Sequence, residues 1–221
     1  QITNNSYTIT PTGNSSNIYL KNCTITNGIK DFCPLGSGLN GICNAIAISG
    51  TYIYVGGSFT TAGGLLANNI AKYDTINNIW TTLGNGLNGT CNAIAISGTD
   101  IYAGGLFTSA DNISANRIAK YNGTTWSALS SGLAGQCNAI AILGSDIYAC
   151  GAFYNAGRTG VNFIAKYNGT TWSALSLELN STCRAIVILN TYIYTGGDFS
   201  IFNGTQSNRI AKYSFDYINL K

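Results

Sequence analysis

The chain has 221 residues, of which only 9% are charged, and its formal net charge of +3 comes from Lys and Arg that are spread along the sequence. This composition gives no support to nucleic acid or an acidic membrane surface as a partner, and no apolar stretch approaches the roughly 20 residues of a membrane span. The chain contains no His, which removes the commonest general base and most transition-metal sites, so we expect no catalytic residue, no cofactor and no metal.

Residues 1–34 are interpreted as a shortened first copy of a repeated unit. SYTITPTG resembles a first strand and NIYLKNCTIT a second, whereas the third strand is missing or merged. Cys23 and Cys33 lie in this segment and are the only pair that we consider for a disulfide bond from the sequence.

Four further copies of the unit follow, and each begins its first strand with Cys. These lead cysteines are Cys43, Cys91, Cys137 and Cys183, at intervals of 48, 46 and 46 residues. A period of this length is typical of repeat architectures. We therefore predict one domain with units at about 1–34, 35–82, 83–128, 129–174 and 175–221. The lead cysteines are interpreted as small buried hydrophobes, because equivalent positions in separate units are too far apart for a disulfide bond.

Each full unit predicts four short strands. In the first, CNAIAIS, alternation places Cys, Ala and Ala on one face and Asn, Ile and Ile on the other. The second, IYxGGxF, carries paired glycines, which suggest that a neighbouring backbone or aromatic ring approaches closely. Cys150 stands where the other repeats have the first glycine of this pair. IAKY forms the third strand, and a turn that is often Asn-Gly leads to a fourth strand with Trp.

Four antiparallel strands cannot bury both faces of one sheet alone, but sheets stacked radially can cover one another. The sequence therefore predicts an all-β fold, a β-propeller with five blades of about four strands and an irregular first blade. An open solenoid is the alternative.

The connection between the second and third strands varies in nearly every position except its closing Asn, whereas the strands are nearly constant. We expect these connections and the blade-to-blade links to emerge on one rim and to form the binding surface, because recognition residues gather in loops on a rigid scaffold. The alternative is that they are unconstrained loops. The candidate partner-binding residues are Thr61, Leu65, Asp111, Asn112, Tyr154, Arg158, Phe202 and Gln206.

Several Asn-x-Ser/Thr sequons are compatible with a secreted or surface glycoprotein. The candidate glycosylation sites are Asn88, Asn112, Asn122, Asn168, Asn180 and Asn203.

The patterns GxGLNGxCNAIAI, IYxGGxFT and NxIAKYNGTTW, over roughly residues 35–218, resemble the kelch-like repeats of the galactose-oxidase-type propeller superfamily. The variant is similar to that of fungal cortical cell-polarity marker proteins and of bacterial and giant-virus surface proteins. Copper oxidases of that superfamily use His and a modified Tyr, and this chain has no His. The resemblance implies a non-catalytic adhesion, assembly or surface role.

We therefore expect a structural or interaction module outside a cell or on a virion or cell surface, which binds a protein partner or copies of itself. The alternative is a lectin with one shallow glycan site per blade.

Overall fold

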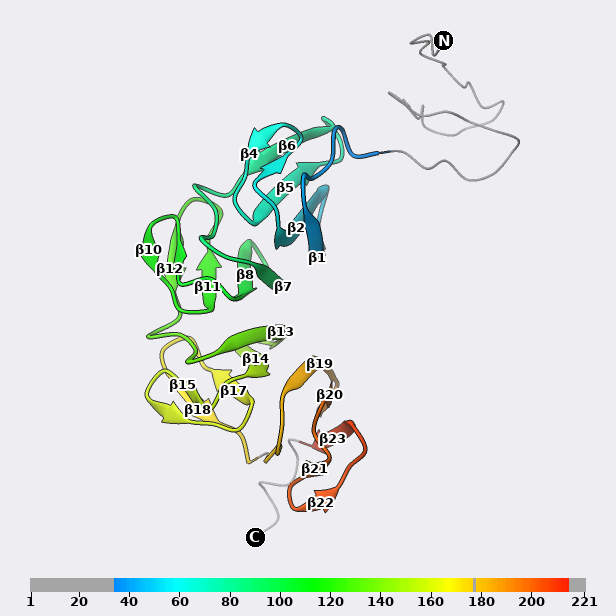
Figure 1. Cartoon of the computed structure of the whole chain (residues 1–221), viewed down its shortest axis with the longest axis vertical. Helices are drawn as coiled ribbons and strands as arrows, with labels where there is room; N and C mark the ends of the chain where they lie inside the picture. The colour runs from blue at the N-terminus through cyan, green and yellow to red at the C-terminus, as the bar shows by residue number, and fades with distance from the viewer. Residues whose placement is uncertain (1–33, 177, 215–221) are drawn as a thin grey trace, which may run out of the picture.

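The computed structural model describes residues 34–176 and 178–214, and Figure 1 shows these as a succession of small sheets arranged in an open arc. Within these residues all regular secondary structure is β-strand, and every strand pair is antiparallel. The prediction of an all-β propeller fold is confirmed. The number of blades in the whole chain stays a prediction, because residues 1–33 and 215–221 lie outside the described part.

The four described blades are numbered here from the N-terminal end. The first three have four strands each, and the fourth has three described strands. The first blade contains β1 (Ile42–Ser49), β2 (Tyr52–Ser58), β5 (Ile70–Asp74) and β6 (Ile79–Thr82). The second contains β7 (Cys91–Ser97), β8 (Asp100–Gly105), β11 (Ile118–Tyr121) and β12 (Trp126–Ala128). The third contains β13 (Gln136–Leu143), β14 (Asp146–Ala152), β17 (Ile164–Tyr167) and β18 (Trp172–Ala174). The fourth contains β19 (Cys183–Leu189), β20 (Tyr192–Gly197) and β23 (Ile210–Ser214).

A β-bulge in the first strand of every blade changes the predicted side-chain faces. In the first blade the pairing register shifts between Cys43 and Ala45, and the other three blades have the same shift. Cys91 and Ile94 consequently lie on one face, where both approach Gly56 of the preceding blade. The prediction that the lead cysteine shares a face with the two alanines was wrong, because strict alternation leaves no place for the extra residue of a bulge.

The paired glycines have two different close neighbours. A Cβ atom at Gly105 would collide with the carbonyl oxygen of Thr90, just before the adjacent strand of the same blade. A Cβ atom at Gly104 would lie 2.5 Å from Sγ of Cys137 in the next blade. The close neighbour of the second glycine is therefore a backbone carbonyl, and the close neighbour of the first glycine is a cysteine thiol.

The bulged Asn also joins one blade to the next. Its Nδ2 donates to the carbonyl oxygen of the following lead cysteine, from Asn44 to Cys91 at 3.4 Å, from Asn92 to Cys137 at 3.2 Å and from Asn138 to Cys183 at 2.8 Å. Arg184 takes the place of this Asn in the fourth blade, and its Nε and Nη2 donate to the carboxylate of Asp198, each at 2.7 Å. In the fourth blade, Arg184 thus occupies the position at which an Asn joins each of the first three blades to the next.

The tryptophan of the fourth strand packs against its own blade and the preceding link. Trp126 is 2% exposed, and its ring centroid lies 5.2 Å from that of Tyr121. Its Nε1 donates to the carbonyl oxygen of Leu83 at 2.8 Å. Trp80 and Trp172 make equivalent bonds to the carbonyl oxygens of Leu35 and Leu129. The repeat-constant Trp is thus a core residue, as the sequence predicts.

Both ends of the described arc expose apolar side chains. On β1, Ile46 and Ile48 are 65% and 70% exposed. On β23, Ile210 is 70% exposed, whereas its equivalent Ile70 is fully buried against the next blade. The described blades therefore do not close a ring among themselves.

Candidate binding surface

Each variable connection between the second and third strands folds as a two-stranded hairpin, not as an irregular loop. The hairpins are β3 (Thr61–Ala62) with β4 (Leu65–Leu66), β9 (Ser109–Ala110) with β10 (Ile113–Ser114), β15 (Asn155–Ala156) with β16 (Thr159–Gly160), and β21 (Ile201–Phe202) with β22 (Thr205–Gln206). In the second hairpin the two turn residues, Asp111 and Asn112, have φ angles of 47° and 66°. Two positive φ angles in succession match the type I′ turn, which Gly, Asn and Asp adopt most readily.

The links between blades pair with these hairpins. Isolated β-bridges join Leu39 to Ala62, Leu87 to Ala110, Leu133 to Ala156 and Leu179 to Phe202. In the second blade, Oδ1 of Asn88 accepts hydrogen bonds from the backbone N–H groups of Thr108 and Ser109 at 2.8 and 2.9 Å. We call the four hairpins with their paired links the hairpin rim. In Figure 1, β10 lies beside β12, away from the first strands on the inside of the arc, and β16 contacts β18 in the same way.

Five of the eight predicted binding residues are exposed on the hairpin rim. They are Leu65, Asn112, Tyr154, Arg158 and Gln206. Tyr154 is 62% exposed, and its ring packs edge-on against Phe163 with centroids 4.6 Å apart, which gives this aromatic side chain a fixed position on the surface.

The other three predicted residues are partly buried and support the rim. The Oδ1 atom of Asp111 accepts from the backbone N–H and Nδ2 of Asn85, at 2.9 and 2.6 Å. The backbone N–H of Thr61 donates to Oδ1 of Asn40 at 2.8 Å, and Phe202 packs into the core between the third and fourth blades. The structure therefore brings all eight residues to one rim and divides them into exposed and supporting positions.

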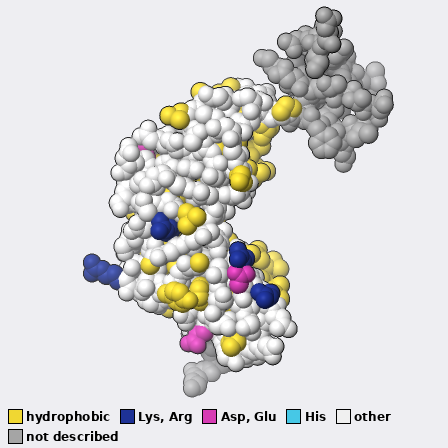
Figure 2. Space-filling model, viewed as in Figure 1, with side chains coloured by type: hydrophobic (Ala, Val, Ile, Leu, Met, Phe, Trp, Pro, Cys, Tyr) yellow, Lys and Arg dark blue, Asp and Glu magenta, His cyan; other side chains and the backbone are white. Residues whose placement is uncertain are grey.

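The four hairpins share their strand pairing, but their tips differ in chemistry. The first tip is apolar, because Leu65 and Leu66 are 47% and 72% exposed. The second carries Asp111 and Asn112, the third an exposed Arg158, and the fourth neutral Asn and Gly. Figure 2 shows that charged side chains are few and scattered over the face in view. Each blade thus presents a different contact surface.

A hollow of about 330 Å³ lies between the first and second hairpins and is lined mainly by Asn side chains. The Nδ2 atoms of Asn68 and Asn69 donate to the carbonyl oxygens of Asn85 and Leu87 at 3.0 and 2.8 Å. These amides consequently hold the link in place, and each uses one of its two N–H donors to do so.

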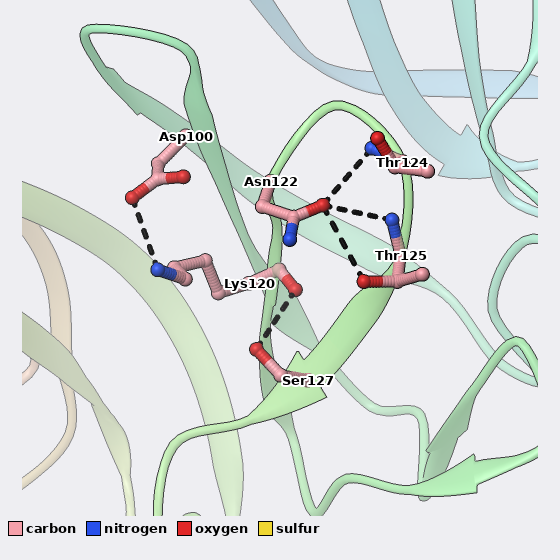
Figure 3. A network of polar contacts seen from close by, with 6 residues as sticks. All are labelled: Asp100, Lys120, Asn122, Thr124, Thr125 and Ser127. Atoms are coloured by element: carbon pink, nitrogen blue, oxygen red, sulfur yellow. Dashed lines mark hydrogen bonds and ion pairs between the residues drawn. The ribbon is translucent and has the colours of Figure 1, made fainter.

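The opposite edge of each blade has turns of a different kind. Figure 3 shows Oδ1 of Asn122 accepting from the backbone N–H groups of Thr124 and Thr125, at 3.0 and 2.8 Å, while Nδ2 has no partner among the residues drawn. Nearby, Nζ of Lys120 pairs with Oδ2 of Asp100 at 3.0 Å, and the hydrogen bond to this carboxylate raises the pKa of Lys120. The same edge of the third blade has an equivalent ion pair, between Lys166 and Asp146.

Comparison with known proteins identifies the family. The model of the Rax2 C-terminal beta propeller domain matches residues 26–193. The chain belongs to this β-propeller family. No curated protein matches the chain.

Among solved structures, the Rax2-type propeller is similar to the crystal structure of the computationally designed Ika4 protein. The TM-score is 0.52 at 15% identity, over 80% of this chain and 93% of that one, so the likeness shows the fold alone. A crystal structure of the computationally designed Ika8 protein also matches, with a TM-score of 0.42 at 12% identity over 77% of this chain and 61% of that one.

Sequence reasoning missed one pair of cysteines in the Rax2-type propeller. Cys23 and Cys33 lie outside the described residues. The predicted bond between Cys23 and Cys33 therefore stays a prediction. Among the described residues, Cys150 and Cys183 of the next blade lie in one core cluster, and both are free thiols. The signal was present in the sequence, since Cys150 occupies a glycine position that faces a lead cysteine.

No helix among the described residues is long and apolar enough to span a membrane. They also contain no group of three or more His, Cys, Asp or Glu side chains that could hold a metal ion.

Proposed function

We propose that this chain is a non-catalytic interaction module, located outside a cell or on a virion or cell surface, whose hairpin rim binds a protein partner or further copies of the chain. The observation that carries the proposal is the contrast between four hairpins with the same strand pairing and four different tips. A surface that changes from blade to blade suits one extended partner better than a small ligand bound once per blade.

The state of the carboxylates supports a non-catalytic role. Asp100, Asp146 and Asp198 each form an ion pair with Lys or Arg. Asp111 accepts hydrogen bonds from the adjoining link, and hydrogen bonds from Asn77 lower the pKa of Asp74 in a turn. These groups are used in structure, and the chain has no His to act as a base. We further propose that the repeat is related to the kelch-like repeats of the galactose-oxidase-type propeller superfamily, which it resembles.

A lectin is the second candidate function. The Asn-lined hollow and the exposed ring of Tyr154 favour it, because amides and aromatic rings suit sugars. The amides of Asn68 and Asn69 already donate to the backbone, however. The hollow is also lined by Asp111 and Asn112, and the other blades have different residues at these two positions. The protein-binding role is therefore preferred.

The binding proposal is tested with photo-crosslinking side chains placed on two edges of the third blade. Positions 154 and 158 lie on the hairpin rim, and Ser145 lies exposed in the turn at the opposite edge as a matched control. The crosslinkers are used with a second, isotope-labelled copy of the chain and with surface proteins of the natural source. We expect polypeptide cross-links from the rim and none from position 145. We also expect Tyr154→Ala to weaken binding roughly 30-fold, as for an interface hot spot, and Ser145→Ala to leave it unchanged.

Two results would overturn the binding proposal. One is cross-linking of equal yield from both edges. The other is a glycan array that shows one sugar class bound with several equivalents per chain, which would establish the lectin.

The surface location predicts which sequons carry glycans. Asn122 and Asn168 lie at exposed turns where the side chain uses Oδ1, whereas Nδ2 is the atom that a glycan modifies. In Asn88 and Asn180 Nδ2 donates to Thr108 and Ser200 across the hairpin rim. On material from the natural source, peptide mapping should find glycans at Asn122 and Asn168 and none at Asn88 and Asn180. Bare Asn122 and Asn168 would contradict a glycosylated surface protein.

A further inference from the structure

The first two interfaces between described blades place a lead cysteine over the first glycine of the preceding blade's second strand. Cys91 faces Gly56, and Cys137 faces Gly104. At both places a Cβ atom added to the glycine would lie 2.5 Å from the facing Sγ atom. These two interfaces therefore leave no room for a side chain in place of the glycine.

The third interface departs from this rule. Cys150 replaces the glycine and faces Cys183, and both side chains are fully buried in the core between the third and fourth blades. Both are free thiols in this structure, and they belong to one core cluster across the interface. The facing positions that hold a glycine and a cysteine at the first two interfaces thus hold two cysteines here.

We propose that Cys150 and Cys183 form a disulfide bond that covalently joins the third and fourth blades. At the second interface an added Cβ atom at Gly104 would lie 3.1 Å from Cβ of Cys137. A disulfide holds its Cβ atoms about 3.8 Å apart, so two cysteines at these facing positions are within reach of a bond. The first two interfaces have glycine at the equivalent position, so this covalent link is specific to the third.

The chemistry requires an oxidant, which is a small or protein disulfide. The thiolate of one cysteine attacks that disulfide and releases one thiol. The second cysteine then attacks the mixed disulfide, the protein bond forms, and a second thiol leaves. Two protein thiols are oxidised, one external disulfide is reduced, and the two protons pass to the released thiolates.

Burial sets when this exchange occurs. Removal from water raises the pKa of the Cys150 thiol, so little thiolate exists once the blades have packed. The bond therefore forms while the third and fourth blades come together, and the closed interface protects it afterwards. This order places the step in an oxidising compartment, which agrees with the proposed surface location but does not depend on the binding role of the rim.

The test is peptide mapping of the full chain after it refolds in a glutathione redox buffer. Free thiols are alkylated under denaturing conditions without reductant. We expect a linked peptide pair that contains Cys150 and Cys183, with two hydrogens fewer than the separate peptides, and alkylated Cys91 and Cys137. Reductant should lower the unfolding temperature by roughly 4–16 °C, from the usual stabilisation by a disulfide in a chain of this size.

The matched variant is Cys150→Gly, which restores the residue of the first two interfaces. It should stay folded and lose the response of its unfolding temperature to reductant. Full alkylation of Cys150 and Cys183 in the refolded wild-type chain would overturn the proposal, as would a bond from Cys150 to Cys137. The mapping of the wild-type chain decides the question even where a variant fails to fold.

Discussion

Replacing Trp126 with Ala is expected to lower the free energy of unfolding by about 3–5 kcal/mol. The indole is 2% exposed, packs on Tyr121, and donates through Nε1 to the carbonyl oxygen of Leu83. The substitution opens a cavity in the core and leaves a buried carbonyl without its donor. Urea unfolding followed by far-ultraviolet circular dichroism measures the loss.

Trp126→Phe separates packing from the hydrogen bond. Phe keeps most of the ring in the core but cannot donate to Leu83, so we expect a loss of about 1–3 kcal/mol, the cost of an unsatisfied buried group. If the Ala and Phe variants lost the same free energy, packing of the indole would not matter and the core assignment would be wrong.

The sequence predicts the repeat scaffold well, because the same packing requirement is written several times. The Trp and Ile-Ala-Lys-Tyr positions are constant and are buried or partly buried in the first three blades, as at Ile118 and Trp126. In the fourth blade the equivalent Ile210 is exposed, and no described blade packs against it. Positions that are identical in every repeat thus identify the residues of the scaffold, but they do not show which blade lies at the end of the arc.

The bulge and the hairpins were harder to predict because they depend on backbone geometry. Asn44 looks like an ordinary residue in an alternating strand, yet it is the extra residue that reverses the faces of the neighbouring Cys43. Asp111 and Asn112 were selected as variable residues, and their type I′ turn was not predicted although both residues tolerate positive φ. Cys150 was noticed as an exception, but only the packing of two blades shows that it meets Cys183.

Replacing Gly104 with Ala is expected to cost about 1–3 kcal/mol, because the new Cβ atom would lie 2.5 Å from Sγ of Cys137. The facing atom belongs to a side chain, so the cost should depend on it. Cys137→Ala removes the sulfur atom and leaves Cδ1 of Ile140 at 3.0 Å and Cβ of residue 137 at 3.1 Å. The double variant should therefore lose at least about 1 kcal/mol less free energy of unfolding than the sum of the two single losses.

Gly105→Ala is the control for this double-mutant cycle. Its added Cβ atom would collide with the carbonyl oxygen of Thr90, which belongs to the backbone and cannot be removed by a side-chain substitution. We expect Gly105→Ala to lower the free energy of unfolding by about 3 kcal/mol, by the same amount in the chain with Cys137 and in the chain with Cys137→Ala. Urea unfolding of the six chains measures every term of both cycles. Strict additivity of Gly104→Ala and Cys137→Ala would mean that the lead cysteine does not pack on the glycine. Coupling there, together with none at Gly105, would establish that the interface between blades is fixed by the fit of one thiol over one glycine.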